Sequence, residues 1–112
     1  MTIREDLECK SNEDFGVQVT WQVDGEDVTL TSGQLHVRRR KADADPLIDL
    51  EADLDGGTAS FLLPAAEVAD LNWPHLDGQT GVYDAVIVSE LGQQRLIEGE
   101  VTFSWGVTRP DD

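Results

Sequence analysis

Residues 48–57 read IDLEADLDGG, and this stretch decides the fold. Apolar side chains alternate with carboxylates over residues 48–55, which is the period of a β-strand with one buried face. A slip of one residue would bury the carboxylates, so the register of this strand is tightly specified. The glycine pair at 56–57 then predicts a tight turn, after which residues 58–63 return as the partner strand.

The same alternation recurs on both sides of this hairpin. Residues 15–23 place five apolar side chains on one face, and Asp24-Gly25 after them predicts a hairpin turn. A short run at 28–30 is closed by Ser32-Gly33, and a turn at 91–93 joins the last two strands. The predicted strands are residues 15–23, 28–30, 34–40, 48–54, 58–63, 82–89 and 95–105.

Only residues 64–71 suit a helix, because proline fits a first turn and alanine-rich sequence follows it. This helix has at most two turns, and residues 72–81 read as an irregular connection. About seven strands with frequent turns and one short helix predict an all-β, Ig-like antiparallel β-sandwich. The length of 112 residues fits a single domain over residues 1–112.

The composition is strongly acidic, with 23 Asp and Glu against 8 Lys and Arg and a net charge of -15. Such a chain repels nucleic acid and anionic lipid, so neither is an expected partner. Only Lys10 and Lys41 are lysines. An acidic, lysine-poor surface favours a salt-loving host, and the alternative is an ordinary acidic protein.

Residues 1–6 turn acidic where the apolar run of a secretory signal would begin, and no stretch is long and apolar enough to span a membrane. The single cysteine, Cys9, has no partner for an internal disulfide. We therefore expect a protein made in the host cytoplasm and kept there or assembled there into something larger.

No residue pattern indicates catalysis or a cofactor. His36 is expected on an outer strand face beside arginines, and His75 lies in a Trp-Pro-His loop without a nucleophile nearby. The acidic segment around Cys9 would raise the pKa of its thiol. Phosphate-binding, nucleophile-elbow and Cys/His metal motifs are absent from the sequence.

A calcium site is one interpretation of the acidic run from Asp43 to Asp55. Carboxylates on alternate strand positions stand in a row and do not converge, and the EF-hand spacing is missing. A solvated acidic face is the preferred interpretation, so no metal site is predicted. The run comprises Asp43, Asp45, Asp49, Glu51, Asp53 and Asp55.

Two features are candidates for an interface. Trp21 and Trp105 fall on apolar strand faces and are expected in the core, which leaves Trp73 in its loop for an exposed role. The run Arg38-Arg39-Arg40-Lys41 holds half of all cations. These arginines pair either with the acidic strand 49–55 or with a neighbouring subunit, and the sequence leaves both open.

Several short pieces resemble the small Ig-like accessory virion proteins that tailed phages and related viruses encode among their tail and fibre genes. The pieces are WQVDG at 21–25, VTLT at 28–31, VR at 37–38, YD at 83–84, LIEGEVT at 96–102 and VTR at 107–109. Gly92 fits the turn glycine usual between the last two strands of that family. The heavy acidity is a departure that would suit a halophilic host.

The resemblance implies a non-enzymatic structural subunit of a tailed virus particle, docked to other virion proteins at the tail, baseplate or fibre attachment in several symmetry-related copies. Arg38, Arg39, Arg40 and Trp73 are its predicted interface residues. One alternative is a capsid-surface decoration protein. A carbohydrate-binding module would need an exposed aromatic platform around Trp73 and Tyr83, and a DNA-mimicking inhibitor would need carboxylates spaced like phosphates.

Overall fold

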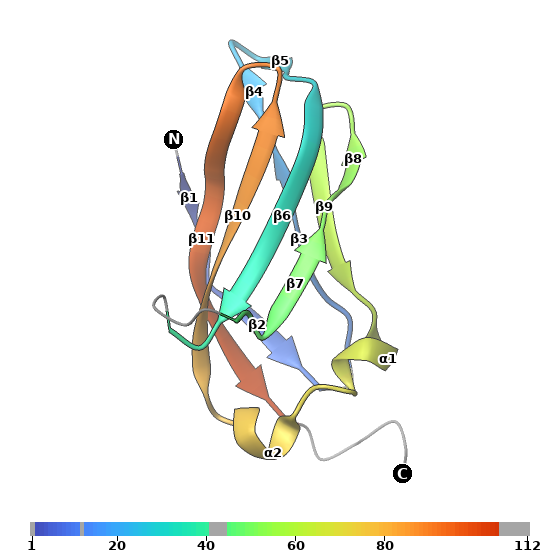
Figure 1. The fold of residues 1–112 in the computed structure, drawn as a ribbon, viewed down its shortest axis with the longest axis vertical. Helices are drawn as coiled ribbons and strands as arrows, with labels where there is room; N and C mark the ends of the chain where they lie inside the picture. Colours follow the sequence, from blue (N-terminus) through green and yellow to red (C-terminus); the bar gives the residue numbers. More distant parts are fainter. Residues whose placement is uncertain (1, 12, 41–44, 106–112) are drawn as a thin grey trace.

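The structure is a computed structural model that describes residues 2–11, 13–40 and 45–105. Most of its strands pack as two sheets, and β4 and β5 form a separate two-stranded hairpin (Figure 1). The strands are β1 Ile3–Arg4, β2 Leu7–Lys10, β3 Phe15–Thr20, β4 Gln22–Val23, β5 Glu26–Asp27, β6 Leu30–Arg38, β7 Ile48–Glu51, β8 Asp53–Asp55, β9 Thr58–Leu63, β10 Thr80–Ser89 and β11 Gly92–Ser104. Two helices, α1 Ala65–Val68 and α2 Trp73–Leu76, lie between β9 and β10.

The strand order confirms the predicted β-sandwich. Sheet A has the order β1-β11-β10-β6-β7 with β2 also paired to β11, and sheet B has the order β3-β9-β8. This is the order of an Ig-like sandwich whose larger sheet carries one additional edge strand. The strands β1 and β2 run parallel to β11, so sheet A is mixed rather than purely antiparallel. The sequence did not predict these two strands.

The core lies between the sheets and is built from alternate residues of each strand. On β10 every second residue from Gly81 to Ser89 is buried, while the residues between them face outward and are half-buried. Leu35 and Val37 of β6 point inward as expected. The largest fully buried side chains are Phe61, Phe103, Leu35, Ile87, Ile97, Val37, Val68, Val101 and Cys9.

The strand predicted over residues 48–54 has the expected faces but is divided between the sheets. Ile48 and Leu50 are buried in β7, and every carboxylate from Asp49 to Asp55 is exposed. At Ala52 the chain leaves sheet A and continues as β8 in sheet B. The Ala52 N–H donates a hydrogen bond to the Gly33 carbonyl at 2.9 Å. Alternation alone cannot reveal this crossing, because the buried face stays inside the sandwich on either side of it.

Ser32-Gly33 does not end a strand, which corrects the sequence prediction. β6 is continuous from Leu30 to Arg38, and Gly33 pairs with Ile87 in the ladder. A Cβ at Gly33 would approach Ala52 Cβ and Ile87 Cδ1 to 2.9 Å. This glycine therefore permits close packing where two strands cross, and it serves no turn.

The prediction for residues 15–23 was too long. β3 ends at Thr20, and Val23 is 45% exposed in the separate β4–β5 hairpin. The hairpin turn itself is confirmed, since Asp24 and Gly25 have φ of 53° and 82°, as a type I′ turn requires. The β8–β9 turn at Gly56-Gly57 is also confirmed.

The connection after β9 is more ordered than predicted. The expected helix is present as α1, and residues 72–81 contain the single turn of α2 rather than irregular chain alone. Within the described ranges, no helix is long and apolar enough to cross a membrane. The last two strands meet at Glu90-Leu91, one residue earlier than expected, with Ser89 paired to Gly92.

Substitution at two adjacent positions tests which face of β7 is buried. Leu50 is 8% exposed and Glu51 points to solvent, so Leu50→Ala should lower the free energy of unfolding by about 2–5 kcal/mol and Glu51→Ala by less than about 0.5 kcal/mol. Chemical denaturation measures both. Equal losses at the two positions would contradict the assigned faces.

Candidate functional site

The outer face of sheet A is the candidate site, and β10 forms its floor. Val82, Val86 and Val88 project outward from this central strand and are half-buried. Strands flank β10 on both sides, so these valines lie in the middle of the sheet. An apolar floor with a polar surround is the usual anatomy of a protein interface.

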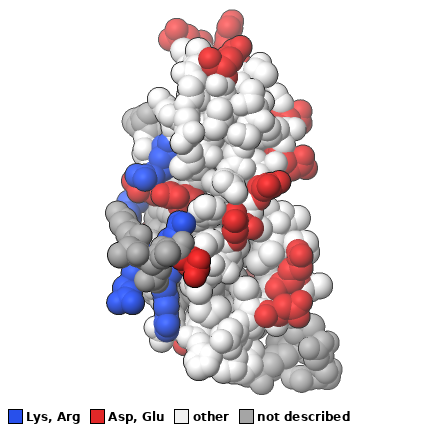
Figure 2. Space-filling view, viewed as in Figure 1, with Lys and Arg blue, Asp and Glu red and all other residues white. Residues whose placement is uncertain are grey.

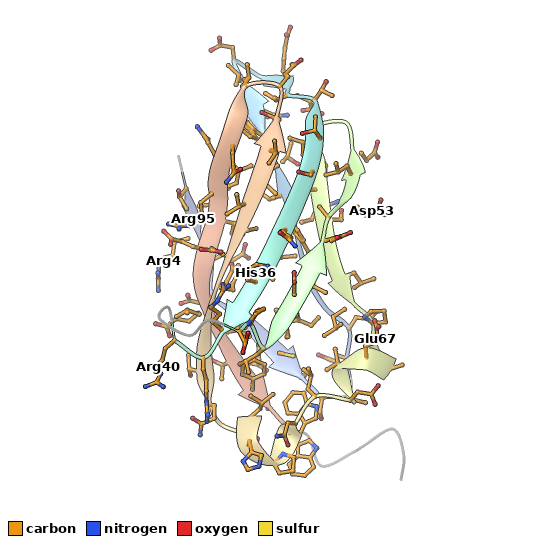
Figure 3. The ribbon with its side chains drawn as sticks, in the orientation of Figure 1. Arg4, His36, Arg40, Asp53, Glu67 and Arg95 are labelled. Carbon is orange, nitrogen blue, oxygen red and sulfur yellow. The ribbon has the colours of Figure 1, made fainter. Side chains whose placement is uncertain are left out.

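One end of this face is hollowed into a groove of about 330 Å³, which we call the arginine groove. β1, β6, β10 and β11 all contribute to it, and Figure 3 shows Arg4, Arg95 and His36 reaching toward the same region from three of these strands. The lining residues are Arg4, His36, Arg38, Val82, Tyr83, Asp84, Arg95, Glu98, Gly99 and Glu100.

Two arginines of the arginine groove form ion pairs with nearby carboxylates. Arg95 Nε lies 3.0 Å from Asp84 Oδ2, and Arg4 lies 3.6 Å from Asp6 and 3.8 Å from Glu100. These pairs are largely solvent-exposed, so each is worth at most about 1 kcal/mol to folding. The groove holds three arginines and three carboxylates. It is therefore balanced in charge, although the whole chain has a net charge of -15.

His36 lies at the side of the groove next to β7. Its Nε2 is 3.1 Å from Asp49 Oδ1, close enough for an ion pair when the imidazole is protonated, but the angle does not make a hydrogen bond. None of the residues lining the groove is a serine, threonine or cysteine that could act as a nucleophile beside this pair.

The other end of the face is a shallower hollow of about 490 Å³ with a different chemistry. Hydroxyl and amide side chains from β6 and β11 surround Val86 and Val88 there. Glu51 is the only charged residue among those that line it. The two hollows lie along the same strand, so the outer face of sheet A offers one long surface with a charged end and a neutral end.

The cations that are visible on this side of the molecule gather on one flank. Figure 2 shows Lys and Arg gathered along one flank of the face with some Asp and Glu among them, and further Asp and Glu at the end of the face and on the opposite flank. Asp53 marks the acidic flank and Arg40 the basic one in Figure 3. Three arginines of a strongly acidic domain, Arg4, Arg38 and Arg95, thus line the hollowed face together.

The structure separates the four predicted interface residues. Arg38 lines the arginine groove, and Arg39 and Arg40 are exposed just past the end of β6. Trp73 is only 3% exposed, which overturns its expected surface role. Its indole packs edge-on against Phe103, with ring centroids 6.2 Å apart, and its Nε1 donates to the Val68 carbonyl at 2.8 Å. The single turn of α2 brings Trp73 under the end of the sandwich.

The predictions for the other aromatic residues are partly wrong and partly confirmed. Tyr83 is 3% exposed, so it forms no surface platform with Trp73, and the carbohydrate-binding interpretation built on these two rings is wrong on this point. Trp21 is buried as expected, and Trp105 is half-buried against the core. The outward positions of β10 hold a threonine, three valines and an aspartate, with no aromatic ring among them.

The residues singled out for chemistry are dispersed. Cys9 is fully buried, and burial raises the pKa of its thiol to about 11, so the direction was predicted but the cause is desolvation rather than neighbouring acids. His75 is exposed on α2. In the described ranges no three His, Cys, Asp or Glu side chains lie close enough to hold a metal ion, and Asp43 lies outside those ranges.

Hydrogen bonds attach the N-terminal segment to the edge of the arginine groove, and the sequence did not predict this contact. The Tyr83 hydroxyl donates to the Glu5 carbonyl at 2.5 Å, and the Glu100 N–H donates to Asp6 Oδ1 at 3.0 Å. The Glu5 carbonyl passes so close to Gly99 that a Cβ there would collide with it. Glycine at position 99 inside a strand was the available signal, because it often marks a close approach of another backbone.

Comparison with known proteins supports the fold and leaves the function open. No protein-family model and no curated protein matches the sequence. The chain is similar to a chain described as an engineered protein, with a TM-score of 0.52 and 14% identity over 92% of this chain and 18% of that one. It therefore spans less than a fifth of that chain. An uncharacterized protein from Bacillus anthracis str. Ames aligns with a TM-score of 0.47 and 11% identity over 90% of this chain and 84% of its own.

Removal of the Tyr83 hydroxyl tests how much its hydrogen bond to the N-terminal segment stabilises the fold. Tyr83→Phe deletes the hydrogen bond to Glu5 and should lower the free energy of unfolding by about 1 kcal/mol. Burial, aided by Glu5 and Asp6 and opposed by Arg4, raises the pKa of Tyr83 from 10.0 to about 12. The folded state therefore keeps a proton that the unfolded state loses, so stability falls as pH rises from 10 to 12.

Tyr83→Phe should accordingly show a shallower loss of stability than the wild type over this pH window. Cys9 also titrates at high pH, but it is common to both proteins and cancels from the comparison. Denaturation at a series of pH values measures the two slopes. Identical slopes would show that Tyr83 is not protonated preferentially in the folded state.

The excess of carboxylates predicts a dependence on salt. With a net charge of -15, self-repulsion weakens the compact state in dilute buffer, and added salt screens it. The melting temperature should therefore rise between low salt and molar KCl. A flat or falling trend would show that the surface carboxylates repel one another too weakly to affect folding.

Proposed function

We propose that this chain is a non-enzymatic docking subunit of a tailed virus particle, attached to other virion proteins through the outer face of sheet A. The observation that supports docking is the character of that face, with its valine floor, its two hollows and its balanced charge. The virus assignment rests on the sequence resemblance, and the acidic, lysine-poor composition favours a halophilic host.

Electrostatic repulsion favours docking on this face over the rest of the surface. A partner that approaches most of this domain meets carboxylates, since acids outnumber cations 23 to 8. At the arginine groove three arginines offset three acids, so approach carries a smaller electrostatic cost. Arginine is also enriched in interface cores because its planar group pairs with carboxylates in fixed geometry.

If a partner docks on this face, the arginines at positions 38–40 form the rim of the interface. Arg38 contributes to the groove, and Arg39 and Arg40 extend the basic surface beyond β6. Charge complementarity at a rim steers the partner and sets its orientation more than it increases affinity. The valines of β10 would supply the apolar contact area once water is excluded.

The test begins with purified virus particles. Mass spectrometry of particles from a host that carries this gene should find the chain in stoichiometric amount, in several copies per particle. Immunogold labelling then places it on the tail or on the capsid surface. Particles that lack the chain would overturn the proposed function.

Two variants then test the face itself. Reversal of Arg38, Arg39 and Arg40 to glutamate, and separately Val86→Arg on the floor, should each cause loss of the chain from assembled particles. Lys10→Glu is the control, because it reverses an exposed cation on β2 away from the groove. Melting curves of each isolated variant check that it folds. Normal incorporation of both test variants would refute docking through this face.

A further inference from the structure

The two long strands of sheet B carry no charged side chain. β3 reads FGVQVT and β9 reads TASFLL, so neither contains an ionisable side chain. Their outward side chains are neutral and make cross-strand hydrogen bonds, Gln18 to Ser60 at 3.1 Å and Thr20 to Thr58 at 3.0 Å. In a chain with 28% charged residues, this surface is an exception.

One side of β3 is an open sheet edge. Within the described residues β3 pairs only with β9, and the Trp21 N–H donates to the Gly57 carbonyl at 2.8 Å in the continuation of this ladder. Hydrogen-bonded pairs alternate along antiparallel strands. The backbone groups of Val17 and Val19 therefore face β9, whereas those of Gly16, Gln18 and Thr20 face away from it.

In an Ig-like sandwich the first strand commonly covers this edge. Here the first two strands pair with β11 in the other sheet instead. The remaining described edge strands of three residues or more all present charged side chains, as natural edges do to prevent unwanted pairing. Those strands are β2 with Glu8 and Lys10, β7 with Asp49 and Glu51, and β8 with Asp53 and Asp55.

We propose that β3 pairs antiparallel with β3 of a second copy of this chain, so that two copies of sheet B join into one six-stranded sheet. The alternation of backbone groups fixes the register, because the outward-facing set is centred on Gln18. Gln18 then lies opposite Gln18 of the second copy, and Gly16 lies opposite Thr20. All outward N–H and C=O groups of these residues find partners.

Side chains agree with this register on both faces of the joined sheet. On the inner face Val17 lies opposite Val19 of the second copy, and such β-branched pairs stabilise antiparallel strands. Val17 is half-buried in the single copy, packed against the core at the open edge. The second copy would cover it. On the outer face the central pair is two neutral amides, which can hydrogen-bond to each other.

The charge distribution favours a second copy as the occupant. The carboxylates of sheet B lie on β8, the strand farthest from the open edge. Across six strands the two β8 strands would stand five spacings of about 4.8 Å apart, or about 24 Å. This is about three times the Debye length of about 8 Å at 0.15 M salt. The carboxylates on the strands of sheet B therefore lie too far apart to repel one another strongly when two copies meet at this edge.

Sedimentation equilibrium of the isolated chain tests the pairing. We expect a concentration-dependent monomer–dimer equilibrium that shifts toward dimer as salt is raised, because salt screens the repulsion between copies of charge -15. Amide hydrogen exchange should show protection of Gly16, Gln18 and Thr20 that grows with the dimer fraction.

Two variants with a matched control locate the contact. Gln18→Lys places like charges opposite each other and should weaken dimerisation by up to about fivefold. Gln18→Pro removes an outward N–H without removing a bond to β9 and should abolish it. Leu62→Lys adds the same charge to the same face on β9, where Leu62 is 59% exposed, and should leave the equilibrium unchanged.

Melting curves of each variant confirm that the monomer folds. A chain that stays monomeric at all concentrations and salts would overturn the proposal. So would a dimer that Leu62→Lys weakens as much as Gln18→Lys does. Protection of the three amides only when other virion proteins are present would assign this edge to a partner's strand and thereby exclude self-pairing. None of these results depends on whether the outer face of sheet A binds to a particle.

Discussion

The central strand β10 is the constraint on which the rest of the structure depends. It is hydrogen-bonded on both sides, to β6 and β11, so its side chains have only two directions available. Buried residues from Gly81 to Ser89 supply the core, and Val82, Asp84, Val86 and Val88 supply the floor of the outer face. A shift of β10 by one residue would place Asp84 in the core and expose Tyr83, Ala85 and Ile87. Core and candidate site are thus set by the same pairing.

Alternation in the sequence predicted the faces of the neighbouring strands well. The inward positions of β6 and β7 follow from an apolar period of two, and the turn residues Asp24-Gly25 identified the β4–β5 hairpin. These features depend on neighbours in sequence. The same reasoning placed Arg38 on an outer face.

The features that sequence alternation missed depend on contacts between segments that are far apart in sequence. The division of residues 48–55 between two sheets depends on the crossing at Gly33, and the parallel strands β1 and β2 depend on the clearance at Gly99. Arg4, Arg38 and Arg95 meet only because their strands are placed around β10. Trp73 looked like a loop residue because nothing in its local sequence shows that α2 turns its ring toward Phe103.

The two proposed contacts use opposite sheets, and their geometry makes them compatible. An antiparallel pair of β3 strands joins the two copies of sheet B in one plane, so the two-fold axis is perpendicular to the joined sheet. Both copies of sheet A then lie on the same side of it, with their outer faces directed the same way. Such a dimer presents two identical docking faces to one surface. Binding of the first face raises the effective concentration of the second, so two weak contacts give a stable attachment. An acidic domain with modest individual contacts would gain most from this arrangement, since each face needs only enough affinity to hold while its neighbour binds.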